Sequence, residues 1–290
     1  MNRDTIKVSL SDMHSGGLTA LFPNYSMTFR IDEKNSLNYA PSPDQIKMYE
    51  HFIRCADEVK RRAIGKKMIV VHNGDAVEGF HHNNIQVVTP NPLHHTEIFI
   101  ELFDTFLDRI GFSVKNGDEL HFTSGTESHT NWQEYGIKNH YEIFGAEYHD
   151  ELCKVINGKT VWWTHHGPNP GKGANEGNAH RNWLRDIYWD SIKEKRQPPH
   201  MVITSHFHKS HYDTYNQSYE HTIHGIVLPS WQMKTRYAHR VVPFQRNDIG
   251  MTVTEITADG HIRVENSELV MDRTVLGGEL PQLEYSEAVR

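Results

Sequence analysis

The feature that most constrains the fold is a series of short apolar segments, each followed by a carboxylate or an imidazole. In the first segment Ile6, Val8 and Leu10 alternate with polar residues, a period of two that predicts a half-buried strand. Asp12 and His14 follow directly. Because residues i and i+2 of an extended chain point the same way, both side chains are predicted to project together from the strand end.

Segments with helical periodicity separate the predicted strands. A helix is predicted from a capping box at Ser42 to about residue 65, because its apolar residues recur at helical spacing. Residues 68–75 begin with a continuous apolar run, typical of a strand buried on both faces. Two further helices are predicted over residues 99–110 and 175–195, and two hairpin turns at Asn157-Gly158 and Asp259-Gly260. This alternation favours an α/β protein.

The composition is typical of a chain that buries a large core. The 290 residues are 37% hydrophobic, and no apolar run is long enough for a membrane span or a signal peptide. We find no internal repeat or low-complexity linker, so we expect one domain over residues 1–270 and a polar tail or arm over 271–290. Two cysteines are too few for a disulfide framework and are expected to be packed free thiols, which favours a cytoplasmic protein.

The charge of the chain argues against strong non-specific nucleic-acid binding, and its histidine content favours metal binding. The net charge is −7 and the chain has no long Lys/Arg block, so strong non-specific nucleic-acid binding is not indicated. Histidine is abundant, with 22 residues that gather in short clusters. Since imidazole is the commonest side-chain ligand of transition metals, the placement of these histidines indicates a metal site.

Five predicted strands end in carboxylate or imidazole groups, at the carboxyl edge where open α/β sheets bind their ligands. In chain order the pairs are Asp12 and His14, Asp75 and Glu78, Glu127 and His129, His165 and His166, and His206 and His208. Mixed Asp/His sets suit Mn, Fe, Ni or Zn better than Ca or Mg. The ligands are too many for one ion, so we expect two ions about 3.5–4 Å apart that share a carboxylate, as in phosphoryl-transfer sites.

These motifs, in this order, resemble those of the calcineurin-like metallophosphoesterases. The family pattern D-x-H, G-D-x-x, G-N-H-D/E, H and G-H-x-H is similar to D-x-H, G-D-x-x-E, G-T-E-S-H, H-H-G and S-H-x-H here, over residues 8–208. The loop HSGGLTALFP and the segment GTESH look most like a subgroup often carried by phages and prophages. The resemblance implies a four-layer α/β/β/α sandwich with two mixed β-sheets.

The resemblance also implies a dinuclear metal centre whose ligands come from four of these motifs. They would be Asp12, His14, Asp75 and His208 for one metal, and Asp75, His206 and one of His165 and His166 for the other. Strand alternation predicts that only one residue of the His165-His166 pair faces the site. A hydroxide held between the ions would attack phosphorus in line, with manganese the preferred metal and iron, nickel or zinc as alternatives.

The third motif departs from the family pattern. Where the family has Gly-Asn-His, this chain has Gly125-Thr126-Glu127-Ser128-His129, so the asparagine ligand of the second metal is absent. We expect Glu127 to replace it as an oxygen ligand and His129 to protonate the leaving group; weak binding of the second metal is the alternative. Weaker candidates for contact with substrate phosphate are His81, His82 and Arg181.

The reaction implied is hydrolysis of phosphate mono- or diesters, and a nuclease acting on DNA is one version of it. The chief rival is a non-catalytic, metal-bound interaction or scaffold module of the same fold, for which the altered third motif is the best support. The expected partner is a phosphate ester substrate, with nucleic acid and a homodimer left open and a membrane not expected.

Overall fold

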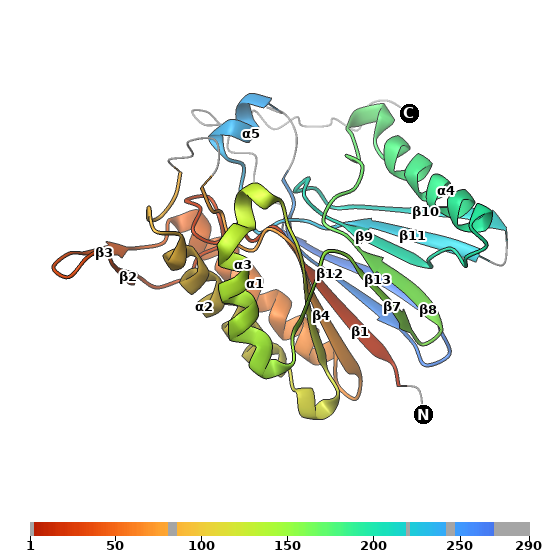
Figure 1. Cartoon of the computed structure of the whole chain (residues 1–290), viewed down its shortest axis with the longest axis horizontal. Helices are drawn as coiled ribbons and strands as arrows, with labels where there is room; N and C mark the ends of the chain where they lie inside the picture. The colour runs from red at the N-terminus through yellow and green to blue at the C-terminus, as the bar shows by residue number, and fades with distance from the viewer. Residues whose placement is uncertain (1–2, 81–85, 219–220, 242–246, 270–290) are drawn as a thin grey trace, which may run out of the picture.

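The computed structural model of the chain describes residues 3–80, 86–218, 221–241 and 247–269 as stacked sheets and helices (Figure 1). The strands are β1 (Thr5–Leu10), β2 (Met27–Arg30), β3 (Ser36–Tyr39), β4 (Lys67–Asn73), β5 (Glu119–Thr123), β6 (Glu147–His149), β7 (Leu152–Ile156), β8 (Lys159–Trp163), β9 (Met201–Thr204), β10 (His211–Ser218), β11 (His221–Val227), β12 (Ile249–Ile256) and β13 (Ile262–Leu269). The α-helices are α1 (Pro43–Arg62), α2 (Pro92–Ile110), α3 (Glu127–Tyr141), α4 (Asn178–Lys193) and α5 (Arg236–Val241), and short 3-10 turns are η1 (Val114–Asn116), η2 (Glu142–Phe144) and η3 (Gly173–Asn175).

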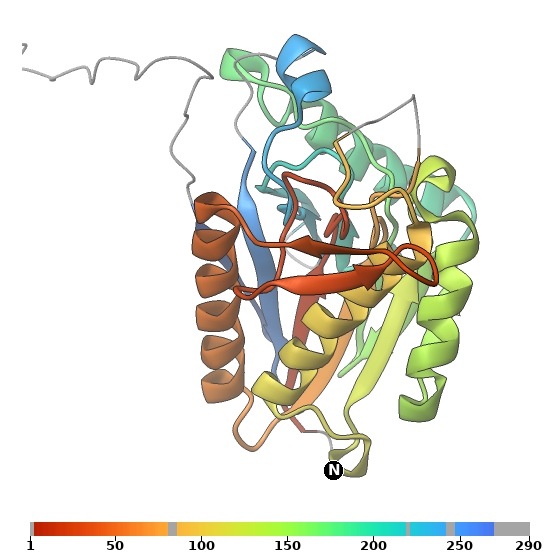
Figure 2. The same ribbon diagram turned by 90° about the vertical axis from the view of Figure 1, so that its left-hand side faces the viewer.

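Two mixed sheets form the centre of the molecule. The first has six strands in the order β13-β12-β1-β4-β5-β6, and the second has five in the order β10-β11-β9-β8-β7. Each sheet combines parallel and antiparallel pairs, for example β1 with β4 and β1 with β12 in the first. Helices α1, α2 and α3 lie side by side on the outer face of the first sheet, and α4 covers the second (Figures 1 and 2). The expected four-layer sandwich is therefore confirmed.

The outer helices form where their apolar stripes and caps predict. In α1 the capping box is present, because Ser42 accepts the backbone N–H of Gln45 while the Gln45 side chain accepts that of Ser42. Helix α2 begins at Pro92, earlier than the predicted residue 99, because Asn91 caps it and its first turn is also buried. Its phenylalanine stripe, which includes Phe99 and Phe103, belongs to the core between the helices and the first sheet.

Strand β1 is buried on both faces, so the prediction of a half-buried strand was wrong. Its polar face is covered by the second sheet, and Lys7 and Ser9 lie in the layer between the sheets. There Trp163 of β8 donates its indole N–H to the Ser9 hydroxyl across 3.1 Å. Alternation revealed the two faces of β1 correctly, but not that a second sheet would cover the polar one.

The predicted turns are present, whereas one cysteine differs from expectation. Asn157 and Gly158 both have positive φ and connect β7 to β8, as a type I′ hairpin requires. Cys55 is a buried free thiol as expected, but Cys153 is exposed. Within the described ranges, none of the helices has the length and apolar character needed to cross a membrane. The predicted tail, residues 271–290, lies outside the described residues.

Candidate metal centre

The segments after β1 and β4 are fastened to each other by backbone hydrogen bonds. The N–H of Asp12 donates to the carbonyl of Gly74 at 3.1 Å, and that of His14 donates to the carbonyl of Asp75 at 3.0 Å. Since β1 and β4 are parallel neighbours, their carboxyl ends meet at one edge of the first sheet. The first two motifs are therefore held side by side.

Asn73, the last residue of β4, connects this edge to the second sheet. Its side-chain nitrogen donates to the carbonyl of Thr164 at 3.0 Å and to the hydroxyl of Ser205 at 2.9 Å, and its side-chain oxygen accepts from Thr123 at 2.9 Å. The carboxyl ends of β5, β8 and β9 are thereby brought to β4. Asn73 was not among the predicted site residues, although a polar residue that ends an apolar strand was a usable signal.

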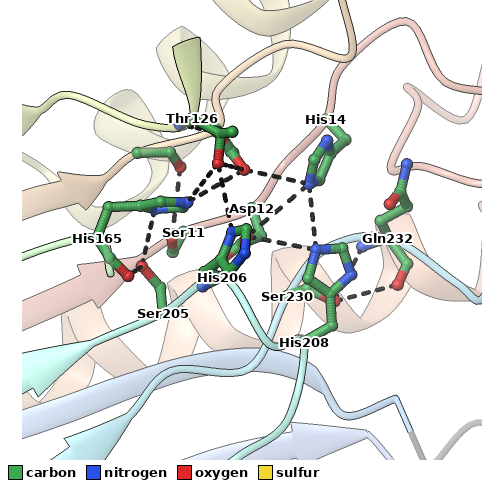
Figure 3. A network of polar contacts seen from close by, with 12 residues as sticks. Ser11, Asp12, His14, Thr126, His165, Ser205, His206, His208, Ser230 and Gln232 are labelled. Carbon is green, nitrogen blue, oxygen red and sulfur yellow. Dashed lines mark hydrogen bonds and ion pairs between the residues drawn. The ribbon is translucent and has the colours of Figure 1, made fainter. Parts of the chain in front are cut away.

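Backbone strain is concentrated among the predicted ligands. Seven described non-glycine residues have positive φ, a region that side chains with a Cβ rarely adopt. Five of them are predicted ligands, namely Asp12, His14, Asp75, His206 and His208. Such strain costs about 1 kcal/mol or more per residue and gathers at functional sites, where the surrounding structure enforces it. The sharp turns point these five side chains toward one another (Figure 3 labels four of them).

The first group of converging ligand atoms comprises Asp12, His14 and His208 (Figure 3). The Nε2 atoms of the two histidines lie 3.1 Å apart, and Asp12 Oδ1 lies 3.3 Å from Nε2 of His208. Asp12 is fully buried, and its Oδ1 has no hydrogen-bond partner among the described residues. A buried carboxylate oxygen that faces two imidazole nitrogens is what a transition-metal ion requires.

The second group lies beside the first and comprises His165, His206 and Thr126, which Figure 3 labels, together with Asp75. Asp75 Oδ2 lies 3.1 Å from Nε2 of His165. The Thr126 hydroxyl lies 3.3 Å from both Asp75 Oδ2 and Nδ1 of His206. Asp12 joins the two groups, since its carboxylate also lies within 4.8 Å of the ligand atoms of Asp75 and His165.

His165 and His166 both lie near His206, and of the two only His165 belongs to the group with Asp12 and Asp75. A ligand atom of each lies within 4.8 Å of the other and of a His206 nitrogen, although the His166 side chain is exposed. Alternation does not apply to this pair because β8 ends at Trp163.

Acceptor oxygens outside the cluster face the Nδ1 atoms of the two innermost imidazoles. Nδ1 of His165 lies 2.7 Å from the carbonyl of Asn73, and Nδ1 of His14 lies 3.2 Å from Oε2 of Glu78. The Glu78 carboxylate in turn accepts from Gln232 at 2.7 Å. Because these acceptors face Nδ1, they select the tautomers that leave Nε2 of both histidines directed at the carboxylates, as metal-bound histidines require.

The pKa values of the buried carboxylates and imidazoles in the site are shifted by one another. Burial alone would raise the pKa of Asp75, but the charge and hydrogen bond of His165 outweigh it and hold that pKa well below its ordinary value. Burial alone would lower the pKa of His14, but the nearby carboxylates of Asp12 and Glu78 outweigh it and raise that pKa to about 10. The site therefore holds ionised carboxylates beside imidazoles that retain a proton, and divalent cations that displace those protons would balance the same charge.

The third motif is arranged differently from the prediction. Thr126, not Glu127, is the residue whose hydroxyl and backbone N–H contact Asp75, the latter at 2.7 Å. Gly125 permits this approach, because a Cβ there would lie 2.3 Å from Asp75 Oδ1. The chain then turns into α3, so Glu127 becomes the exposed first residue of that helix. No group of converging ligand atoms among the described residues includes Glu127.

The remaining predicted residues are not brought into the cluster by any described contact. His129 lies within α3, but its side chain is outside the described part of the structure, as are His81 and His82 altogether. Arg181 lies on α4, where its Nη1 is 3.2 Å from Oδ2 of Asp213.

Comparisons with known proteins add only distant likenesses. No protein-family model and no curated protein matches the chain. Among solved structures, a Streptococcus pneumoniae protein described as a predicted phosphoesterase aligns with 92% of this chain and 99% of its own, at 12% identity and TM-score 0.35. An archaeal phosphodiesterase aligns with 90% of this chain and 99% of its own, at 11% identity and TM-score 0.41. A Thermotoga maritima protein aligns with 91% of this chain and 99% of its own, at 12% identity and TM-score 0.34. These TM-scores are too low to support a functional inference.

Proposed function

We propose that this chain is a metal-dependent hydrolase of phosphate esters, related to the calcineurin-like metallophosphoesterases, with two divalent transition-metal ions side by side. The observation that carries the proposal is the position of Asp75. Its Oδ2 lies 3.8 Å from Nε2 of His14 in the first group and 3.1 Å from Nε2 of His165 in the second. A carboxylate between two sets of imidazoles is placed to be shared by two cations.

The donor set fits two such ions. The proposed ligands are Asp12, His14, Asp75 and His208 for one ion, and Asp75, His165 and His206, with Thr126 and His166 nearby, for the other. Bound at these residues, the two cations would supply the positive charge that activates a water and stabilises the phosphoryl group during transfer.

The chain's own groups prepare the site for this chemistry. Asp12 and Asp75 are buried and have pKa values held below the ordinary range, because hydrogen bonds and charges of nearby histidines outweigh the effect of burial. Both therefore remain ionised and ready to bind cations at neutral pH. Glu78 and the Asn73 carbonyl hold the imidazoles of His14 and His165 in orientation. His129 remains our proposed donor of a proton to the leaving group.

The test uses the full chain loaded separately with Mn²⁺, Ni²⁺ and Zn²⁺ and assayed on p-nitrophenyl phosphate and bis-p-nitrophenyl phosphate. Activity is expected with at least one metal, and Asp75→Asn should reduce kcat about 1,000-fold or more and release bound metal. Asp44→Asn on the exposed start of α1 is the matched control and should retain wild-type rates. Inactivity of wild-type protein with all three metals and both esters would overturn the proposal.

The nature of the ester is decided by a second assay. Cleavage of single-stranded or duplex DNA would identify a nuclease, as the family resemblance allows, and its rate should then fall steeply with added salt. Hydrolysis confined to small esters would identify a phosphatase or phosphodiesterase. Two metal equivalents per chain with no hydrolysis of a broad ester panel would instead identify the rival, a non-catalytic metal-bound module.

A further inference from the structure

A second set of ligand-type side chains converges under α4, away from the residues assigned above. His180 of α4 and His211 and Asp213 of β10 each place one ligand atom within 4.8 Å of the other two. The rings of the two histidines have centroids 5.3 Å apart in a T-shaped arrangement. Helix α4 packs over β10 on the outer face of the second sheet (Figure 1), so this cluster lies between a helix and a strand.

Burial without hydrogen bonds distinguishes this cluster from an ordinary polar contact. His180 is completely buried, and neither of its ring nitrogens has a hydrogen-bond partner among the described residues. Nε2 of His211 and Oδ2 of Asp213 are likewise buried and without such a bond in the described part of the chain. A buried polar group left unbonded destabilises a protein, so several of them meeting at one point indicate a ligand that satisfies them.

Two glycines lie so close to the cluster that a side chain at either position would contact it. A Cβ on Gly225 of β11 would lie 2.5 Å from Cε1 of His180, so the ring packs directly on the strand backbone. Gly177 precedes α4 with φ +82°, and a Cβ there would lie 3.0 Å from both Asp213 Oδ2 and His211 Nε2. A side chain at either position would therefore crowd the cluster.

One cation already faces the cluster. Arg181 Nη1 lies 3.2 Å from Asp213 Oδ2, the oxygen that is also 3.6 Å from Nε2 of His211. The Arg181 side chain is 49% exposed and also donates to Asn178, so it lies at the mouth of the cluster and not within it. This ion pair satisfies one carboxylate oxygen in part but leaves both nitrogens of His180 unbonded.

We propose that His180, His211 and Asp213 bind one divalent cation of the zinc type, separate from the dinuclear centre. Two imidazoles and one carboxylate form a ligand set that zinc uses with a fourth position open to water or an exogenous ligand. The bound cation would satisfy His180 and His211 and would displace Arg181 from Asp213. The inference does not depend on phosphoesterase activity, because it uses none of the residues assigned to that function.

The decisive test is a crystal of the full chain grown with Zn²⁺, with anomalous differences measured on both sides of the zinc edge. An anomalous peak within coordination distance of His180, His211 and Asp213 is expected, in addition to any at the dinuclear centre. A map that shows zinc at the dinuclear centre but no peak at these three residues would overturn the inference.

Variants supply an independent readout by metal analysis of purified protein. Asp213→Asn and His211→Gln should each lower the zinc content by one equivalent per chain. His224→Gln is the matched control, because that histidine lies on the neighbouring strand β11, bonds to Tyr212 at 2.8 Å and contributes nothing to the cluster. Arg181→Ala should tighten binding of this equivalent about 3- to 10-fold by removing a competing cation. Unchanged zinc content in correctly folded Asp213→Asn and His211→Gln proteins would contradict the proposal.

Discussion

Nδ1 of His165, which follows β8 in the second sheet, lies 2.7 Å from the backbone carbonyl of Asn73, which ends β4 in the first. A carbonyl oxygen only accepts, so Nδ1 carries a proton and Nε2 is the ring nitrogen that faces Asp75, where a bound cation would take the place of the Nε2 proton. A contact between the two sheets therefore also fixes the tautomer of a proposed metal ligand. The packing of the two sheets against each other therefore also orients His165 for metal binding.

Asn73→Ala should destabilise the protein strongly. The substitution removes the side-chain hydrogen bonds to Thr164, Ser205 and Thr123 and leaves their buried groups unsatisfied. We expect a loss of about 2–4 kcal/mol in the free energy of unfolding, measured by urea denaturation. Asn38→Ala, which removes an exposed side-chain contact in the β2–β3 hairpin, is the control and should change stability by less than about 0.5 kcal/mol. Equal effects of the two variants would contradict this account of Asn73.

Thr126→Val should weaken one metal site. Valine keeps the shape of threonine and the backbone hydrogen bond to Asp75, but it removes the hydroxyl that lies between Asp75 and His206. Metal titration by calorimetry should show about a 10-fold or larger loss of affinity in one of two binding events. Two binding events of wild-type affinity would show that the hydroxyl has no part in the site.

Glu127→Ala is the matched comparison for Thr126→Val. Because Glu127 is exposed at the start of α3, its removal should leave both metal affinities within about twofold of wild type. Loss of one metal equivalent in this variant would instead support our original sequence-based prediction that Glu127 is a ligand.

Glu78→Gln should lower metal affinity without removing any proposed ligand. The Glu78 carboxylate lies 3.2 Å from Nδ1 of His14 and makes that imidazole a stronger donor, whereas a neutral amide would not. We expect about a 10- to 100-fold weaker affinity for one metal, measured by competition with a chelating dye. Glu97→Gln on the exposed surface of α2 is the control. An effect of equal size in both variants would exclude a specific role for Glu78.

The predictions from the sequence were successful where carboxylate and imidazole side chains recur at the ends of predicted strands. Asp12, His14, Asp75, His206 and His208 were predicted from their positions after apolar segments, and the structure brings all five together. Alternation does not apply where the chain leaves the strand. His165 and His166 follow the end of β8, and Glu127 begins a helix, so a period of two no longer describes which side chains share a direction.

Contacts between distant segments could not be predicted from one sequence. Glu127 was predicted as the oxygen ligand that replaces the missing asparagine, and only the hydrogen bond from the Thr126 backbone N–H to Asp75 shows that Thr126 contacts this carboxylate. The cluster of His180, His211 and Asp213 joins a helix to a strand about 30 residues later and has no local signal. Lys7 is buried by the second sheet, and no pattern in the sequence around β1 indicates that this sheet covers it.

Lys7→Met should stabilise the protein at neutral pH, by an amount that falls as the pH rises. Lys7 is fully buried between the sheets, with Nζ 3.2 Å from Sδ of Met201 and 5.9 Å from the centre of the Trp163 ring. Burial lowers its pKa from 10.5 to about 7. Between these two values the unfolded chain binds the proton more tightly than the folded protein, so wild-type stability should rise with pH across that window.

The measurement is the difference in unfolding free energy between Lys7→Met and wild type at pH 7, 8, 9 and 10. We expect about 3–5 kcal/mol in favour of the variant near pH 7, shrinking steadily toward pH 10 because the free energy needed to remove the proton from the unfolded-state lysine falls as the pH rises. Lys47→Met is the control, because that side chain is 69% exposed and its difference should be small and independent of pH. A difference that stays constant from pH 7 to 10 would mean that Lys7 keeps its proton in the folded protein, balanced by groups other than Met201 and Trp163.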